Sequence, residues 1–301
     1  MTQHTLANAF TLNGKGLHTG MQIAAKFNPA PEHFGIVFQR IDLPGKPCIP
    51  ALATHVVATE RGTVIANAEA TVSTIEHAMA ALMAHGIDNC LIEINAPEMP
   101  ILDGSAFFIV NAIQKAGIVA QDCPRQYFEI KEEIAFSHNG STITFLPDTQ
   151  FTAQVSVDFN SAVLPPQIAN LTSLQAFDKE LAAARTFVFV REIAPLLQHN
   201  LIKGGDLDNA IVIYDQEMSQ QEVDHLCNLL KIPTIHLNQL GYLNRKPLVF
   251  ENEPARHKLL DLIGDLSLIG MPIKGRVIAT KPGHTFNTQV AKQLIQNYLT
   301  K

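Results

Sequence analysis

The residues best suited to chemistry lie in a short run near the C-terminal end of the chain, from His257 to Asp265. In an α-helix His257, Asp261 and Asp265 would stack on one face, because residues four apart lie one turn above each other. An imidazole followed one turn later by a carboxylate is ligand spacing for a divalent metal. The nine residues alone also fit a solvated helix face with an i,i+4 pair, and by themselves they favour that plainer interpretation.

A second segment, Ser73 to Leu82, places Glu76 and His77 at the start of an apolar stretch of helical character. Catalytic zinc typically has three protein ligands and one open position, so His77 could complete a His₂Asp site with Glu76 beside the open position. Two plainer interpretations stay open here. Ser73 and Glu76 have the spacing of a capping box, and His77 alone could be an ordinary histidine near a helix start.

A third segment, Lys281 to Asn287, holds His284 in a Pro/Gly turn, where a loop can present a side chain to a cleft. Amide hydrolysis needs a proton for the departing amine, and a cationic imidazole can supply it near neutral pH. Taken alone, His284 is better explained as an exposed loop histidine.

Together these segments resemble the UDP-3-O-acyl-N-acetylglucosamine deacetylases, the zinc amidases that commit Gram-negative bacteria to lipid A synthesis. Seven ordered segments, nearly end to end, carry the resemblance: Gly16–Gly20, Thr74–His77, Gly86–Asn89, Asn95–Ser105, Arg185–Phe187, His257–Asp265 and Gly283–His284. Seven segments in order are far more specific than one metal spacing.

The resemblance implies that His77, His257 and Asp261 hold one catalytic Zn²⁺, although Fe²⁺ or Co²⁺ could use the same ligands. It implies that Glu76 is the general base that takes a proton from the attacking water. His284 would be the general acid or an electrostatic stabiliser of the oxyanion. The sequence leaves open how Glu76 and His284 divide the proton transfers.

Further roles follow from the same resemblance. Asp265 would hold the charge and orientation of His284, and Thr186 would donate a hydrogen bond to the tetrahedral oxyanion. Lys258 would reach a substrate oxygen or phosphate, and Phe187 would pack on the sugar region.

An insert from Ile193 to Ile213 would, again by resemblance, build a hydrophobic passage for the acyl chain. Ile193, Ile202 and Leu207 are the candidates to line it, and ordinary core packing explains each of them equally well.

The implied reaction removes the N-acetyl group from UDP-3-O-((R)-3-hydroxyacyl)-N-acetylglucosamine and releases acetate. One alternative is a paralogue that acts as a zinc amidase on another acylated amino sugar. Another is a non-catalytic protein that binds a UDP-sugar or lipid, although such a protein would not need the whole constellation. A zinc protease is disfavoured because the chain has no HExxH motif.

Composition and sequence pattern limit the kinds of binding partner and the cellular compartment that we expect for this protein. A net charge of -6 argues against general nucleic-acid binding, which usually brings a basic surface. The four cysteines, Cys48, Cys90, Cys123 and Cys227, have no CxxC pairing and suggest reduced thiols in the cytoplasm. The N-terminal residues lack the pattern of a secretory signal, and no apolar run reaches the roughly 18 residues of a membrane span, so stable membrane insertion is not expected. A monomer is the expectation from the family.

The pattern of elements predicts an α+β protein. We expect helices over residues 73–85 and 106–116, and strands over 90–95, 127–134 and 141–145. Apolar periodicity lapses around Gln121 to Arg125, which predicts an N-terminal domain of residues 1–124 and a C-terminal domain of residues 125–301. A weak sequence similarity between residues 86–94 and 206–213 suggests that the chain has two related halves. The resemblance implies two similar domains whose helices are sandwiched between their sheets, with zinc at the interface.

Two features depart from the family pattern. The segment between Ile213 and His257 is longer than in familiar members and includes a helical pattern over residues 220–230; His225 and His236 within it are not added to the metal site. Asp206 stands where a serine is usual, and an extra carboxylate there could disfavour a phosphate or an acyl chain.

Overall fold

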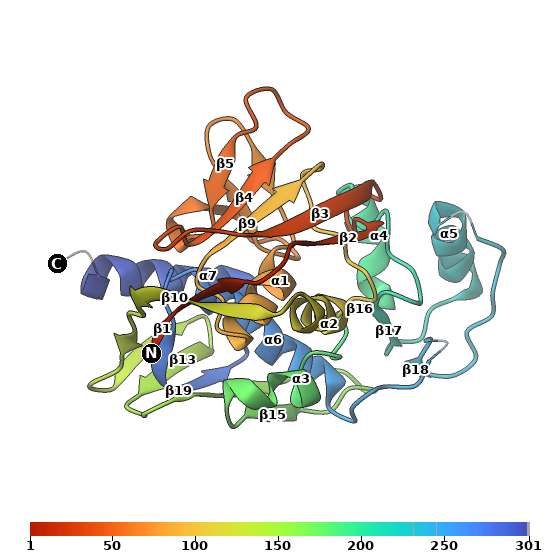
Figure 1. Ribbon diagram of the computed structural model, residues 1–301. Helices are drawn as coiled ribbons and strands as arrows, with labels where there is room; N and C mark the ends of the chain where they lie inside the picture. The colour runs from red at the N-terminus through yellow and green to blue at the C-terminus, as the bar shows by residue number, and fades with distance from the viewer. Residues whose placement is uncertain (231, 245, 300–301) are drawn as a thin grey trace.

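Two mixed β-sheets face each other across a layer of helices, and Figure 1 shows α1, α2, α6 and α7 in that layer. The coordinates are those of a computed structural model, which describes residues 1–230, 232–244 and 246–299. Helices and strands are interspersed along the chain, so the fold is α+β, as the sequence predicts.

The N-terminal half forms the upper sheet of Figure 1, with strand order β2-β3-β9-β4-β5. These strands are β2 (Phe10–Lys15), β3 (Gln22–Pro29), β4 (Ile36–Arg40), β5 (Cys48–Pro50) and β9 (Cys90–Ile94). Helix α1 (Glu76–Ala84) precedes β9 and α2 (Phe107–Ala116) follows it. A smaller sheet contains β6 (Val56–Ala58), β7 (Val64–Ala66) and β8 (Thr71–Val72), and the 3-10 turn η1 (Ala53–His55) precedes it.

The C-terminal half forms the lower sheet, with strand order β12-β13-β19-β14-β15 and β11 paired to β19. Its strands are β11 (Phe128–Glu129), β12 (Ile134–His138), β13 (Ser141–Leu146), β14 (Phe151–Val157), β15 (Gln167–Leu171) and β19 (Ile273–Thr280). Helix α6 (Glu253–Ser267) precedes β19 and α7 (His284–Leu294) follows it, and η2 (Leu174–Ala176), α3 (Phe177–Glu180) and η3 (Ile295–Leu299) complete this half.

The two sheets repeat one topology. The central strand, β9 or β19, is antiparallel to one neighbour and parallel to the other in both halves. Each central strand lies between two helices in sequence, α1 and α2 in one half and α6 and α7 in the other. The two halves are therefore similar, and the helix before each central strand, α1 or α6, bears candidate ligands.

Helices α1 and α6 pack against each other within the helical layer. All residues of α1 except Ala84 are buried, and most of α6 is buried as well. A helix that is buried on all sides must satisfy any polar side chain it carries, so Glu76, His77, His257, Asp261 and Asp265 need partners inside the protein.

The insert expected over residues 193–213 is part of a larger insert, which follows β15 and α3 on one side of the molecule. It consists of β16 (Phe187–Phe189), α4 (Val190–Gln198), β17 (Ile211–Tyr214), α5 (Gln220–Leu230) and β18 (Gly241–Tyr242). Strands β16 and β17 are parallel, so α4 is the crossover helix of a βαβ unit. The predicted helix over residues 220–230 is confirmed as α5.

Several local predictions need correction. The sequence similarity between residues 86–94 and 206–213 pairs the wrong segments. Strand β17 belongs to the small sheet of the insert, and the counterpart of β9 is β19. Residues 121–124, where the apolar periodicity lapses, form the end of a strand, β10 (Ile118–Pro124), which pairs with β1 (Thr2–Leu6). The strand predicted over residues 127–134 is instead two short strands, β11 and the start of β12, and the first helix begins at Glu76 rather than Ser73.

The division at residue 124 stays a proposal. It fits the change of pairing partner, since β10 pairs with β1 and β11 pairs with β19. Among the described residues, no helix combines the length and apolar character that crossing a membrane requires.

Candidate metal centre

Three side chains that sequence analysis brings together as ligands do converge in the structure. Ligand atoms of His77, His257 and Asp261 all lie within 4.8 Å of one another. Asp261 Oδ1 is 3.3 Å from His257 Nε2 and 3.9 Å from His77 Nε2. Since α1 supplies His77 and α6 supplies the other two, the contact between these helices assembles the cluster.

The cluster has the chemistry of a metal site. Asp261 Oδ1 is buried and has no hydrogen-bond partner among the described residues. A buried carboxylate oxygen without a partner is costly unless something else binds it. Zinc bonds of about 2.0–2.2 Å in a tetrahedron put ligand atoms roughly 3.3–3.6 Å apart, close to the separations found here. The residues present therefore fit a divalent cation bound by two imidazoles and one carboxylate.

Ionisation in the cluster suits a cation. Burial lowers the pKa of His77 to about 3 and lowers the pKa of His257, so both rings are neutral and keep a lone pair for a metal. Burial alone would raise the pKa of Asp261, but the neighbouring imidazoles and the Lys258 ammonium outweigh it and hold that pKa below its usual range. Asp261 is therefore a carboxylate near neutral pH.

Neighbouring groups fix the orientation of the candidate ligands His257 and Asp261. His257 Nδ1 lies 3.0 Å from the carbonyl oxygen of Ala184, so Nε2 points toward the cluster. Lys258 Nζ donates a 2.8 Å hydrogen bond to Asp261 Oδ2, which leaves Oδ1 as the free oxygen. Lys258 thus contacts a candidate ligand directly, and its ammonium also lies 5.6 Å from the centre of the Phe187 ring.

Glu76 is the first residue of α1 and is buried at the edge of the cluster. Its Oε2 accepts a 3.0 Å hydrogen bond from the backbone N–H of Thr63, while the Ser73 hydroxyl donates to the carbonyl of Pro97. The capping box considered from sequence is therefore not formed. Burial raises the pKa of Glu76 to about 7, with further raising by Asp261 and Asp265 and an opposing effect from His284.

His284 is the first residue of α7 and is held by Asp265. Its Nδ1 lies 2.9 Å from Asp265 Oδ2, and that oxygen also accepts a 2.9 Å hydrogen bond from Asn287 Nδ2. Burial alone would lower the pKa of His284, but Asp265 and Asp261 outweigh it and raise the pKa to about 9. The structure thus brings an acid with a raised pKa and a cationic imidazole to the same cluster.

A cavity of about 140 Å³ opens onto these groups. It is lined by Leu17, Arg61, Thr74, Glu76, His77, Ile101, Thr186, Phe187, His257, Lys258, Asp261 and His284. Most of the site residues expected from sequence thus face one space, while Asp265 lies behind His284. Backbone bonds hold Thr186 in place, because its N–H donates to Gly104 and its carbonyl accepts from Ile211.

The passage candidates lie together in the insert. Ile193, Ile202 and Leu207 belong to one apolar cluster, which also includes Leu226 and Leu230 of α5. The long segment before α6 therefore packs against the same cluster rather than projecting away from it.

Asp206 has a structural explanation. Its Oδ1 accepts hydrogen bonds from the N–H groups of Asp208 and Asn209, and its Oδ2 lies 3.4 Å from Lys15 Nζ. Its charge is therefore engaged in a turn and an ion pair between the insert and β2.

The Gly16–Gly20 segment is a turn held by one buried carboxylate. Glu98 accepts hydrogen bonds from the N–H groups of His18 and Thr19 and from the Thr19 hydroxyl. A β-carbon built at Gly204 would lie 2.0 Å from the carbonyl oxygen of Gly16, so the insert passes directly over this turn. This contact places Leu17 in the cavity wall.

Three further residues at this site, Thr63, Arg61 and Asn287, were not predicted from the sequence. Thr63 is fully buried and bonds both Glu76 and Asp265, Arg61 lines the cavity, and Asn287 supports Asp265. Asn287 was detectable from its position about one helical turn after His284. Thr63 and Arg61 lie in a turn with no metal or catalytic spacing, so no sequence signal marked them.

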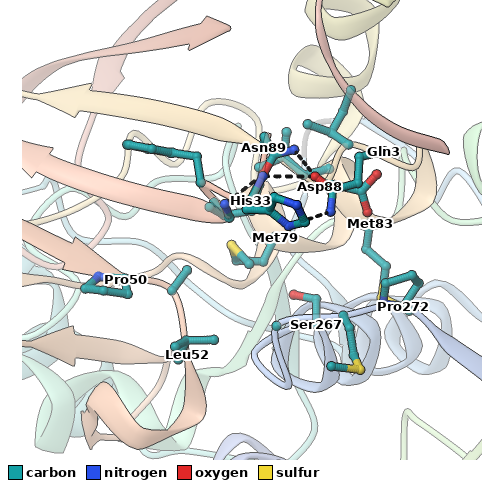
Figure 2. Close-up of a pocket in the computed structure, with 18 of the residues that line it drawn as sticks. Gln3, His33, Pro50, Leu52, Met79, Met83, Asp88, Asn89, Ser267 and Pro272 are labelled. Carbon is teal, nitrogen blue, oxygen red and sulfur yellow. Dashed lines mark hydrogen bonds between the residues drawn. The ribbon is translucent and has the colours of Figure 1, made fainter. Parts of the chain in front are cut away.

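A second cavity, about 260 Å³, lies at the other end of the α1–α6 pair. Figure 2 shows Met79 and Met83 of α1, Ser267 of α6, and the polar residues Gln3 and Asp88 around it. It contains none of the candidate ligands or proton-transfer residues.

Comparisons with known proteins agree with the site. A model of the family described as UDP-3-O-acyl N-acetylglycosamine deacetylase matches residues 3–226 and 232–296. The chain is 37% identical to a UDP-3-O-acyl-N-acetylglucosamine deacetylase of Pseudomonas entomophila over 97% of its own length and 90% of that protein. It is 38% identical to the same-named protein of Citrifermentans bemidjiense over 98% of its length and 89% of that protein.

Longer relatives match as well. The chain is 54% identical to "Bifunctional enzyme LpxC/FabZ" of Bacteroides thetaiotaomicron over 98% of its own length. It covers 64% of that relative, and 63% of the bifunctional enzyme of Porphyromonas gingivalis. The chain thus spans less than two thirds of the length of these bifunctional relatives.

Proposed function

The chain belongs to the UDP-3-O-acyl N-acetylglycosamine deacetylase family, and from this premise we propose that it hydrolyses the N-acetyl group of UDP-3-O-((R)-3-hydroxyacyl)-N-acetylglucosamine. Water and the amide give acetate and a free 2-amino group on the sugar. This reaction is the committed step of lipid A biosynthesis in the family.

One observation carries the proposal. A carboxyl group with its pKa raised to about 7 and an imidazole with its pKa raised to about 9 face the same cavity as a His₂Asp cluster with a free carboxylate oxygen. Acids and bases with strongly perturbed pKa values around one cavity are typical of hydrolytic sites. A protein that only binds a UDP-sugar would have no use for this combination.

His77, His257 and Asp261 are the residues that would hold the cation, and we propose Zn²⁺ as that cation, with Fe²⁺ able to use the same ligands. When bound, the cation supplies Lewis acidity that polarises a carbonyl and makes water more acidic. The free Asp261 Oδ1 and the two neutral rings support this ligand set.

Glu76 and His284 divide the proton transfers in this mechanism. The Glu76 carboxylate takes a proton from the water as its oxygen attacks the acetyl carbon. The C–N bond then breaks, and the His284 imidazolium gives its Nε2 proton to the departing amine. Asp265 accepts the Nδ1–H bond of His284 and so keeps the ring charged and oriented.

The remaining cavity residues bind substrate. Thr186 donates a hydrogen bond to the developing oxyanion, which is a stabilisation worth several kcal/mol in hydrolytic enzymes. Lys258 contributes positive charge near the substrate oxygens, and the Phe187 ring packs on the sugar. Ile193, Ile202 and Leu207 line the passage for the acyl chain.

The cellular setting belongs to the same proposal. We place the protein in the cytoplasm as a monomer that acts on a small UDP-linked substrate and binds no nucleic acid. The four free cysteines support a reducing compartment, and the net charge of -6 supports the lack of a nucleic-acid partner.

The decisive experiment measures acetate release from UDP-3-O-(3-hydroxyacyl)-N-acetylglucosamine. Protein reconstituted with one equivalent of Zn²⁺ is compared with Fe²⁺-loaded protein and with a chelator-treated sample. Chelator-sensitive turnover supports the proposal, and the ratio of the two loaded forms tests the choice of cation. No turnover with metal bound would favour an amidase for another acylated amino sugar.

A further inference from the structure

Thr63 lies between the candidate base, Glu76, and Asp265, the carboxylate that holds the candidate acid, His284. It is fully buried in the turn between β6 and β7, in the N-terminal half. Its backbone N–H donates a 3.0 Å hydrogen bond to Glu76 Oε2, and its hydroxyl donates a 2.5 Å hydrogen bond to Asp265 Oδ1. One residue therefore contacts both the carboxylate of Glu76 and the carboxylate of Asp265, which holds His284.

The Thr63 hydroxyl completes the hydrogen bonds of Asp265. Asp265 Oδ2 accepts from His284 and Asn287, so Thr63 is the donor to the opposite oxygen, Oδ1. Three donors on a fully buried carboxylate determine its rotation about the side chain. The Thr63 Oγ1 also lies 3.4 Å from His284 Nδ1, so it borders the bond that Asp265 makes to the imidazole.

The turn that carries Thr63 belongs to the N-terminal half and contacts α7 of the C-terminal half and α4 of the insert. Thr59 Oγ1 lies 2.7 Å from Thr285 Oγ1 of α7, and the Arg61 guanidinium lies 2.9 Å from Glu192 of α4. A β-carbon built at Gly62 would lie 3.2 Å from Glu76 Oε1, so the backbone of the turn runs close against that carboxylate. The turn is thus set relative to both halves before substrate binds.

We propose that Thr63 is a positioning residue of the hydrolytic site: its hydroxyl orients Asp265, and through it the His284 imidazole, relative to Glu76. This inference rests on the proposed roles of Glu76 and His284. Thr63 touches no substrate atom in this scheme and acts only through its two carboxylate partners. Removal of such a supporting hydrogen bond typically costs about 10- to 100-fold in activity.

The test compares Thr63→Val, which keeps the shape and loses the hydroxyl, with Thr63→Ser, which keeps the hydroxyl. Thr63→Val should lower kcat about 10- to 100-fold with little change in KM or zinc content, and Thr63→Ser should stay within a few fold of the unaltered protein. Thr59→Val is the matched control, because it removes a cross-interface hydroxyl from the same turn without touching a catalytic carboxylate. It should leave kcat unchanged.

A second readout does not depend on turnover. In protein labelled with ¹⁵N-histidine, with the His284 signals assigned by loss in His284→Gln, Thr63→Val should shift the Nδ1 resonance and Thr59→Val should not. If the unaltered protein releases no acetate, the proposed function fails, yet this resonance still tests the contact.

Three results would overturn the inference. They are full activity of Thr63→Val, equal impairment of Thr63→Val and Thr63→Ser, and an unchanged His284 resonance in Thr63→Val. Should Thr63→Val fail to fold, Thr63→Ala and Thr63→Ser form the next pair, since both are smaller than threonine and only serine keeps the hydroxyl. Equal kcat in that pair would also reject the role.

Discussion

Gly264 of α6 lies directly against the backbone of Glu76 in α1. A β-carbon built at Gly264 would sit 2.1 Å from the carbonyl oxygen of Glu76, far inside any real contact. Only glycine lets the two helices approach this closely at the point where α1 begins. That approach brings Glu76 and His77 to the other candidate ligands, His257 and Asp261, and to Asp265 on α6.

We therefore expect Gly264→Ala to separate α1 from α6. Overpacking of a core typically costs about 1–3 kcal/mol, and here the clash is with backbone that cannot rotate away. Urea unfolding should show this loss, and zinc affinity measured by chelator competition should fall with it. Gly283→Ala is the control, because a β-carbon added there would meet nothing within 4 Å; similar stability of both variants would contradict the argument.

Substitutions should separate the loss of proton transfer from the loss of metal binding. Glu76→Ala should retain the cation and lose turnover by roughly 10²- to 10⁴-fold, because a general base contributes about that much. His257→Ala should lose both, because it removes a ligand. Metal analysis beside acetate release checks this, with exposed Glu69→Ala as the control; equal metal loss in Glu76→Ala and His257→Ala would remove Glu76 from the role of base.

The pH profile should reflect the two perturbed groups. Glu76 must be ionised to act as a base, so kcat/KM, which reports the free enzyme, should rise with pH through its pKa of about 7. His284 must be protonated to act as an acid, so kcat/KM should fall as pH rises through its pKa of about 9. A bound cation adds positive charge and moves both limbs to lower pH.

Asp265→Asn tests the assignment of the alkaline limb. Asp265 is the main group that raises the pKa of His284 against burial. Its neutralisation should therefore move the alkaline limb of the kcat/KM profile to lower pH, with a lower maximum value. An alkaline limb that stays in place would mean that His284 does not set it.

A buried ion pair supports the segment that carries Thr186 and leads into β16, which begins at Phe187. Arg185 Nε lies 2.8 Å from Glu253 Oε1, and both side chains are almost fully buried. Arg185→Met would leave the Glu253 charge buried without its partner, which should cost about 3–5 kcal/mol in unfolding free energy. Lys15→Met breaks an exposed pair with Asp206 and should cost about 1 kcal/mol or less; equal losses would argue that the buried pair is not a special support.

Acyl-chain binding can be tested by filling the passage. Leu207→Trp should lower turnover of a long-chain substrate much more than turnover of a short-chain analogue, because the added volume would displace only the distal methylenes. Exposed Ile168→Trp is the control. Equal effects of Leu207→Trp on both substrates would place Leu207 outside the passage.

The sequence by itself determined the residues of the candidate metal cluster and the helical character of the segments that bear them. His257 and Asp261 are four residues apart on one helix, so local periodicity is enough to place them together. Glu76, His77 and His284 were likewise predicted, because they belong to ordered segments with a family resemblance, although α1 begins at Glu76 rather than at Ser73. The α+β class followed from the same alternation of patterns.

Only the tertiary structure decided how these parts meet. The counterpart of β9 is β19 rather than β17, because pairing partners far apart in sequence define a sheet. The roles of Thr63 and Gly264 depend on contacts with residues far away in sequence, Asp265 and Glu76 respectively. Neither residue has a sequence spacing that sets it apart. The effect of a hydroxyl or of a missing β-carbon depends on which residues the fold packs against it.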